Sequence, residues 1–286
     1  MRLTSNCVAT REAACPATLP VAASLVAALA LATAASGATR NIMITGYWPP
    51  TNEMVRQFST NPAQNPGGWK GENWKGSGYN IMSYFPEFPD GQPGQGVGDF
   101  EVNYTDTSAD FWRITAEVNP IAIITFSRGR FGSNWEIEQR NKNRNDWTPD
   151  FTGATPGTNP PDSTAPLNFA RSSTLPMNQI RDAVNAAGLG VNAFIDTSFD
   201  GAGNYLSGYM AYHGVWYQSM HRLQTDPNWC IAAGHIHVGI GTSVEAATAA
   251  TEITLDELTK YLDTRIPAPS SLAVLGGVFA MARRRR

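Results

Sequence analysis

Ser207 has the chemistry and the position of a nucleophile. It follows Gly201 and Gly203, which interrupt any preceding strand, and it falls in the first turn of a predicted helix. Free backbone N–H groups and the helix dipole at that end favour a developing negative charge. A strand, a glycine-rich turn and a serine at a helix start present the nucleophile in several hydrolases. The alternative is that Ser207 only caps the helix, because serine is favoured at such positions.

Two histidines, His235 and His237, are two residues apart on a predicted strand and therefore share one face of it. A His-x-His pair suggests a metal site, but zinc requires further ligands. Neither a His-Glu-x-x-His motif nor a closely spaced pair of cysteines accompanies the two histidines. We therefore expect no metal here. The alternative for each histidine alone is a hydrogen-bonded side chain of the core or the surface.

Strands and helices that alternate along the chain must position these side chains. Apolar runs predict the strands, and amphipathic patterns with capping residues predict the helices. We expect strands at 41–45, 79–84, 121–126, 191–196 and 230–238. We expect helices at 52–58, 108–118 and 176–187, a further helix that begins at Leu206, and a last helix that begins at a capping box at Thr254. This alternation predicts an α/β fold, a three-layer α/β/α sandwich with a mostly parallel central sheet. The aperiodic stretch 148–171 predicts a functional loop or lid.

Both ends of the chain carry the marks of sorting signals. Arg2 and Arg11, an apolar run at 19–32 and small residues at 34–38 predict a secretory signal peptide over 1–38. Its removal would take Cys7 and Cys15 and leave Cys230 alone, so we expect no internal disulfide. The main domain is expected at 39–263. Between residues 39 and 264 the chain has 14 Lys and Arg against 23 Asp and Glu, a net charge of −9, which argues against nucleic-acid binding.

The last segment, 264–286, combines a Pro267-Ala268-Pro269 hinge, a short apolar stretch at 272–282 and four terminal arginines. This three-part order resembles the PEP-CTERM sorting signal of exported bacterial proteins, with alanine where that signal usually has glutamate. The resemblance implies an exosortase-type processing enzyme as a partner, transient membrane contact through the tail, and delivery to the cell surface or the extracellular matrix. The alternative is a plain C-terminal membrane anchor.

Several motifs in the body occur in the order of one known family. The sequence has Thr-Gly-Tyr-Trp-Pro at 45–49, Gly129-Arg130 followed by Glu136 and Asn141, Ser-Thr-Leu-Pro at 173–176, Gly-Asn-Tyr-Leu-Ser at 203–207, and Ile-His-Val at 236–238. These motifs resemble pyroglutamyl peptidase I, the cysteine peptidases that remove N-terminal pyroglutamate, over nearly all of residues 41–261. The resemblance implies the same α/β fold and a hydrolase of peptides or small amides that needs no cofactor and is compatible with homo-oligomers, and the sorting signals at both ends add that it is exported.

The resemblance also implies a catalytic triad of Ser207, His237 and Glu136. Ser207 replaces the family's nucleophilic cysteine, His237 is the base and Glu136 the carboxylate that orients it. Tyr47, Leu206 and Arg130 are the implied substrate-binding residues.

This chain departs from the family at several positions. The nucleophile is serine, the residue after it is Gly208 instead of asparagine, and the family's Asp-Ala-Arg-Ile-Pro-Asp motif becomes 145–150 without its arginine. A serine hydroxyl is far less acidic than a thiol. The alternative function is therefore a catalytically inactive surface or matrix protein on the same scaffold.

Overall fold

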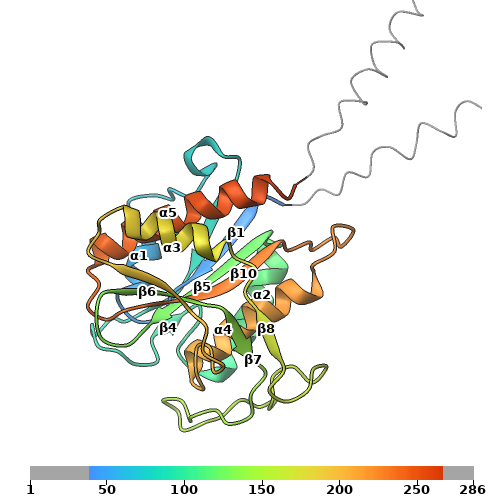
Figure 1. Ribbon diagram of the computed structural model, residues 1–286. Helices are drawn as coiled ribbons and strands as arrows, with labels where there is room; N and C mark the ends of the chain where they lie inside the picture. Colours follow the sequence, from blue (N-terminus) through green and yellow to red (C-terminus); the bar gives the residue numbers. More distant parts are fainter. Residues whose placement is uncertain (1–38, 267–286) are drawn as a thin grey trace, which may run out of the picture. The chain divides into compact units, whose positions relative to one another are not determined.

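The computed structural model describes residues 39–266 (Figure 1). The predicted signal peptide at 1–38 and residues 267–286, which hold nearly all of the predicted sorting tail, lie outside the described residues. Between residues 39 and 266, none of the helices is both long enough and apolar enough to cross a lipid bilayer.

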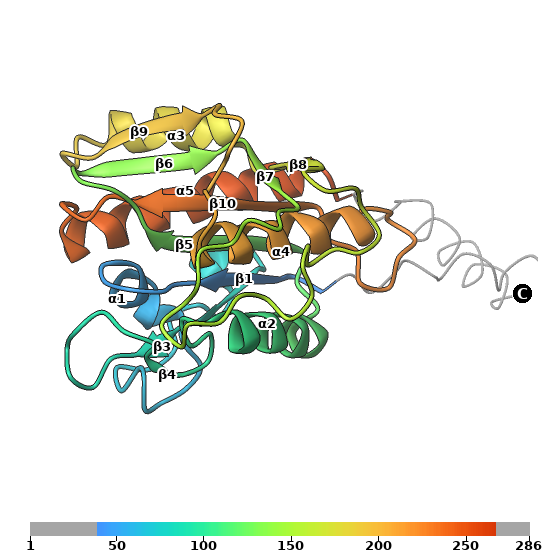
Figure 2. The ribbon, with the colours of Figure 1, turned by 90° about the horizontal axis from the view of Figure 1, so that it is seen from below.

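A six-stranded sheet forms the centre of the body, in the order β2-β1-β5-β10-β6-β9 (Figures 1 and 2). Its strands are β1 (Asn41–Thr45), β2 (Asn80–Tyr84), β5 (Ala122–Arg128), β6 (Asn134–Glu138), β9 (Asn192–Asp196) and β10 (Ala232–Val238). The first four in spatial order are parallel, β6 pairs antiparallel with β10, and β9 pairs parallel with β6. The expected α/β fold with a mostly parallel sheet is confirmed.

Helices cover both faces of this sheet (Figure 2). One face carries α1 (Thr51–Val55), α3 (Met177–Ala186) and α5 (Val244–Asp263), and the other carries α2 (Tyr104–Val118) and α4 (Leu206–Met220). Because side chains alternate along a strand, each strand feeds two cores. In β1, Ile42 and Ile44 pack in the core beneath α1, α3 and α5, whereas Met43 packs in the core beneath α2 and α4.

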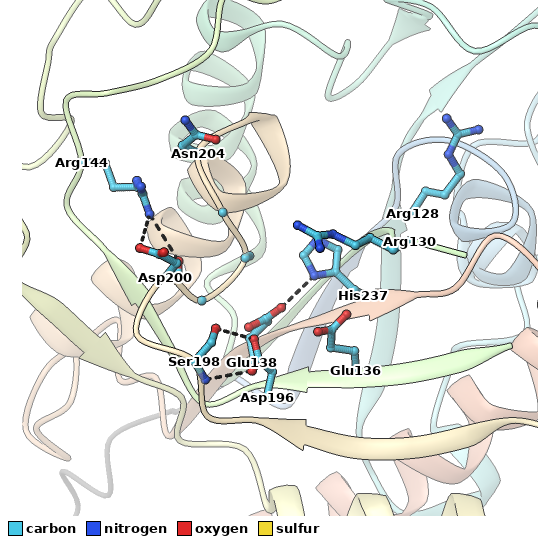
Figure 3. A pocket seen from close by; sticks show the side chains of 14 residues that line it. Arg128, Arg130, Glu136, Glu138, Arg144, Asp196, Ser198, Asp200, Asn204 and His237 are labelled. Carbon is cyan, nitrogen blue, oxygen red and sulfur yellow. Dashed lines mark hydrogen bonds and ion pairs between the residues drawn. The ribbon is translucent and has the colours of Figure 1, made fainter. Parts of the chain in front are cut away.

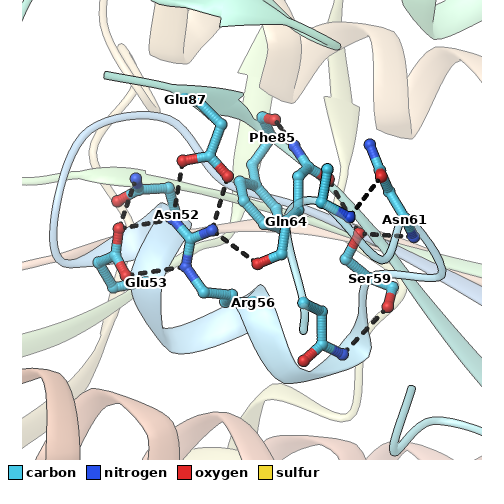
Figure 4. Close-up of polar contacts among 10 residues, drawn as sticks. Asn52, Glu53, Arg56, Ser59, Asn61, Gln64, Phe85 and Glu87 are labelled. Atoms are coloured by element: carbon cyan, nitrogen blue, oxygen red, sulfur yellow. Dashed lines mark hydrogen bonds and ion pairs between the residues drawn. The ribbon is translucent and has the colours of Figure 1, made fainter. Parts of the chain in front are cut away.

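Short elements complete the body. They are the 3₁₀ turns η1 (Arg56–Phe58) and η2 (Trp74–Gly76) and the strand pairs β3 (Pro86–Glu87) with β4 (Val97–Gly98) and β7 (Arg140–Lys142) with β8 (Ala170–Ser172). Arg56, at the start of η1, contacts α1, β3 and the loop at Gln64 (Figure 4). Its guanidinium donates to both carboxylate oxygens of Glu53 and of Glu87, and to the carbonyl oxygen of Gln64. The planar guanidinium fork suits such bidentate pairing, so Arg56 ties α1 to β3.

Helix starts are where the sequence-based expectations fail most. Helix α2 begins four residues before the expected cap at Ser108, and Asn103 caps it by accepting a hydrogen bond from the backbone N–H of Asp106. Helix α5 begins after Ser243, so the capping box expected at Thr254 is wrong. The Thr254 hydroxyl donates instead to the carbonyl of Ala250 one turn earlier inside the helix. Strand β6 was not expected at all.

Candidate active site

The candidate site lies where β10 meets β6, the one antiparallel junction of the described sheet (Figure 3). His237 on β10 is paired directly with Glu136 on β6, and Glu138 lies two residues further along β6. Because side chains alternate along a strand, both carboxylates point to the same face of the sheet as His237. This face opens into a cleft of about 670 Å³.

His237 is oriented by Glu138. Its Nδ1 donates a hydrogen bond of 2.8 Å to Oε1 of Glu138, whose side chain is 1% exposed. Burial raises the pKa of Glu138, and the hydrogen bond and positive charge available from His237 oppose that rise. A proton held on Nδ1 leaves the lone pair on Nε2 of His237, which is the form a general base requires.

Glu138, and not the expected Glu136, is therefore the carboxylate that is hydrogen-bonded to His237. Glu136 is half-buried beside His237, and burial also raises its pKa, opposed by the charges of His237 and Arg130. Residue spacing from Arg130 selected Glu136, and the register of β6 against β10 also pairs Glu136 directly with His237, but Nδ1 donates its hydrogen bond to Glu138, two residues further along β6. The alternation of buried Trp135 and Ile137 with Glu136 and Glu138 is the pattern that could have predicted a strand here.

The cleft is bounded by the ends of strands β5 and β9, the segments that follow them, and the turn before α4. Arg128 ends β5 and Gly129 and Arg130 follow it, Asp196 ends β9 and Ser198 follows it, and the glycine-rich turn 201–204 closes the opposite side (Figure 3). Gly129 permits close packing beside the base, because a Cβ there would lie 3.1 Å from the His237 Cβ. Gly201 has a φ of +55°, and a Cβ there would lie 2.0 Å from the Arg140 carbonyl oxygen.

Ser207 lies in the first turn of α4, three residues after the turn that lines the cleft. It is partly exposed, and its side chain caps no backbone group at the helix start. Within residues 39–266 no hydrogen bond joins Ser207 to His237, and Ser207 is not among the residues that line the cleft. The turn is tight, since a Cβ at Gly208 would lie 2.1 Å from the Gly203 carbonyl oxygen.

The three predicted substrate-binding residues lie in different surroundings. Arg130 lines the cleft, as expected for a substrate contact. Tyr47 is 2% exposed and its hydroxyl hydrogen-bonds to Thr107, while Leu206 is 1% exposed and packs in the same core. Neither of these two lines the His237 cleft. Arg128 lies there instead, with its guanidinium 4.8 Å above the ring of Trp48.

Two other reactive side chains are structural. His235 is fully buried, and both ring nitrogens are hydrogen-bonded, Nδ1 to the hydroxyl of Thr125 and Nε2 to that of Ser127. Burial holds the pKa of His235 well below its usual value, so the ring is neutral. Cys230 is a buried free thiol whose pKa is raised by burial, which is the opposite of what a nucleophile needs.

Comparison with known proteins identifies this fold among solved structures. No family model and no curated protein sequence matches the chain. A pyrrolidone carboxyl peptidase from Thermococcus litoralis aligns with a TM-score of 0.56 and 20% identity, over 79% of this chain and 96% of that one. Pyroglutamyl peptidase I from Bacillus amyloliquefaciens aligns with a TM-score of 0.55 and 16% identity, over 77% and 97%. At such identities the likeness shows the fold.

Proposed function

We propose that this protein hydrolyses N-terminal pyroglutamyl or related amide bonds, with Ser207 as nucleophile, His237 as general base and Glu138 as the carboxylate that orients it. The observation that carries the proposal is the 2.8 Å hydrogen bond between His237 and Glu138 in a cleft bounded by the turn before Ser207. The structural neighbours described as pyrrolidone carboxyl peptidases support the same reaction class.

In this mechanism Nε2 of His237 takes the proton of Ser207 Oγ as the oxygen attacks the amide carbon. The carbonyl oxygen then becomes an oxyanion, and free backbone N–H groups at the start of α4 are placed to stabilise it. His237 returns the proton to the leaving nitrogen, and water cleaves the acyl-serine by the same steps. Glu138 stabilises the transiently protonated imidazole. Ser207 must come within hydrogen-bond reach of Nε2 for the first step.

A second candidate is a protein that has kept the scaffold and lost the reaction. Two observations favour it: among the described residues Ser207 is not hydrogen-bonded to His237, and Gly208 packs against the Gly203 carbonyl where the family has asparagine. A serine in a site built for thiolate chemistry also lacks the low pKa that activates cysteine.

The two candidates are separated by turnover of pyroglutamyl and other aminoacyl amides by purified protein. The hydrolase predicts measurable turnover that Ser207→Ala reduces by at least 10³-fold, as removal of a nucleophile does. Ser198→Ala is the matched control, because Ser198 lines the same cleft but only donates to Asp196. Turnover that survives Ser207→Ala would remove Ser207 from the mechanism.

If the parent protein shows no turnover, Ser207→Cys tests whether His237, Glu138 and the cleft can still support the reaction. Activity gained by Ser207→Cys would mean that the dyad and the cleft are intact and only the nucleophile is silenced. No activity in either form would favour the non-catalytic protein.

We also propose that the protein is exported and that an exosortase-type enzyme processes its C-terminus. The support is the sequence of residues 1–38 and 264–286, with the positive start, apolar run and small residues at one end and the Pro hinge, apolar stretch and arginine cluster at the other. Delivery to the cell surface or extracellular matrix follows from that arrangement.

A further inference from the structure

Three side chains in the cleft bring together atoms that could bind a metal ion. One carboxylate oxygen each from Glu136 and Glu138 and a ring nitrogen of His237 all lie within 4.8 Å of one another. The three residues sit on adjacent, directly hydrogen-bonded strands, so their positions are fixed by the sheet and not by a flexible loop (Figure 3). A carboxylate, carboxylate and imidazole set is one that divalent metal ions accept in proteins.

One atom of this cluster lacks a partner. Oε2 of Glu138 is buried and has no hydrogen-bond partner within the described part of the chain. The side chain is 1% exposed and lines the cleft. A buried carboxylate is normally paired or bound to a metal, because an unpaired one is costly. The hydrogen bond from His237 satisfies Oε1 only. A cation at Oε2 would supply the missing partner.

The neighbouring arginines do not fill that role. Arg130 and Arg128 line the cleft, yet within residues 39–266 neither forms an ion pair with Glu136 or Glu138. Arg144, on the opposite side of the cleft, forms ion pairs with Asp146 and Asp200. Both glutamates therefore line the cleft without an arginine ion pair among the described residues.

Although the sequence predicted no metal at the two histidines, we propose that His237, together with Glu136 and Glu138, binds a zinc-class divalent cation whose open coordination positions face the cleft. Zinc is favoured within that class because one ligand is imidazole, and because zinc ranks above manganese and iron in affinity for such sites. A cation at this place occupies the base of the proposed hydrolase and withdraws His237 from proton transfer. Zinc is therefore expected to inhibit any Ser207-dependent turnover reversibly, and the binding itself does not depend on that turnover.

Glu136 is the residue that separates the two proposals. The cation needs its carboxylate, whereas the Ser207–His237–Glu138 mechanism does not. Glu136→Gln is thus expected to lower zinc affinity by 10-fold or more, as loss of a metal ligand or its support does. Asp200→Asn is the matched control: it removes one negative charge from the same cleft, but from the side held by Lys142 and Arg144.

The experiment is calorimetric titration of ZnCl₂ into the EDTA-stripped, tag-free full-length chain. Cys7 and Cys15 are replaced by serine throughout, because free thiols outside the body bind zinc themselves. We expect one zinc per chain, weakened at least 10-fold by Glu136→Gln and by His237→Gln but not by Asp200→Asn or Ser207→Ala. Melting curves with and without zinc show that each variant is folded.

Three outcomes would overturn the proposal: no zinc bound by the parent, equal affinity of Glu136→Gln and parent, or an equal loss in Asp200→Asn, which would indicate attraction by the general charge of the cleft. Failure of the hydrolase proposal would look different. A chain that binds zinc through Glu136 but hydrolyses nothing keeps the cation site and loses only the reaction.

Discussion

At the scale of single residues, the site is organised by a carboxylate that is expensive to bury. Glu138 is held almost fully out of water, with one oxygen bonded to His237 and the other without a partner among the described residues. Burial penalises its charged form, which is why its pKa is raised. Such a group is retained for what it does to its neighbour, since functional sites commonly sacrifice stability for chemistry.

We expect Glu138→Gln to stabilise the metal-free protein at pH 7 by on the order of 1 kcal/mol while abolishing turnover. The pKa of Glu138 is higher in the folded protein than in the unfolded chain, where glutamate titrates at about 4.3. The parent therefore loses stability as the pH rises from about 4.3 through the pKa of Glu138 in the folded protein. The advantage of the variant should therefore be full at neutral pH and vanish below about pH 4. Denaturant unfolding in EDTA at several pH values measures it. A less stable variant at pH 7 would contradict the account.

At the scale of elements, periodic patterns were predicted well and boundaries and irregular segments were not. Strand β1, helix α3 and strand β9 lie within a residue or so of their predicted ranges, because their apolar runs are bounded by glycine or proline. Strand β6 was missed because the alternation of buried Trp135 and Ile137 with Glu136 and Glu138 lies in a segment only five residues long. Without β6 the sequence could not place Glu138 beside His237, although Glu138 is the carboxylate to which His237 Nδ1 donates.

The stretch 148–171 is aperiodic as expected, and α-helix and β-strand are absent from it before Ala170. Two buried carboxylates, Asp150 near its start and Asp162 in its middle, anchor it to the body, and Asp150 accepts a hydrogen bond from the backbone N–H of Tyr104. Asp162 is 0% exposed and accepts hydrogen bonds from Arg171, from the Tyr212 hydroxyl on α4, and from the backbone and hydroxyl of Thr164. None of residues 148–171 lines the His237 cleft. The segment is therefore pinned to α4 at its middle.

We expect Asp162→Ala to lower the free energy of unfolding by about 3–5 kcal/mol, because it leaves Arg171 and Tyr212 without their buried partner. Burial acts to raise the pKa of Asp162, but the hydrogen bonds from Thr164, Arg171 and Tyr212 outweigh it and the pKa is lowered. A lowered folded pKa contributes stability above the unfolded value, about 3.9, and that contribution is lost as pH falls through the folded value. The loss in Asp162→Ala should thus persist down to about pH 4 and shrink below it.

Urea unfolding and limited proteolysis of 148–171 check this expectation. The control is Asp182→Ala, which removes an exposed ion pair with Arg181 and should change little. Equal stability of Asp162→Ala and the parent would show that the loop is not anchored through Asp162.

At the scale of the whole molecule, the fold follows from alternation of strands and helices, but the site does not. Ser207, His237 and the two glutamates come from three elements separated by up to about a hundred residues, and only the sheet order β10-β6 brings the last three together. No local pattern in the sequence encodes that junction. His237 and Arg130 were candidates from the family resemblance, and both line the cleft, at or just beyond the ends of strands that apolar runs predict.

The last prediction concerns the cellular location of the protein, and it depends on the sequences of the two ends that flank the acidic body. A positive start, an apolar run and small residues favour translocation and cleavage at the N-terminus. At the other end an apolar stretch of about eleven residues is too short to anchor stably alone, and Arg283 to Arg286 would remain on the cytoplasmic side. We therefore expect a mature protein outside the inner membrane, with a new N-terminus between about Ala34 and Thr39 and without the arginine tail.

Cell fractionation with mass spectrometry of both termini measures this directly. A variant with the four arginines replaced by serine should keep its C-terminus if the cluster is needed for processing. A soluble cytoplasmic protein with intact Met1 and Arg286 would refute export, while a processed N-terminus with an intact tail would refute exosortase-type processing alone.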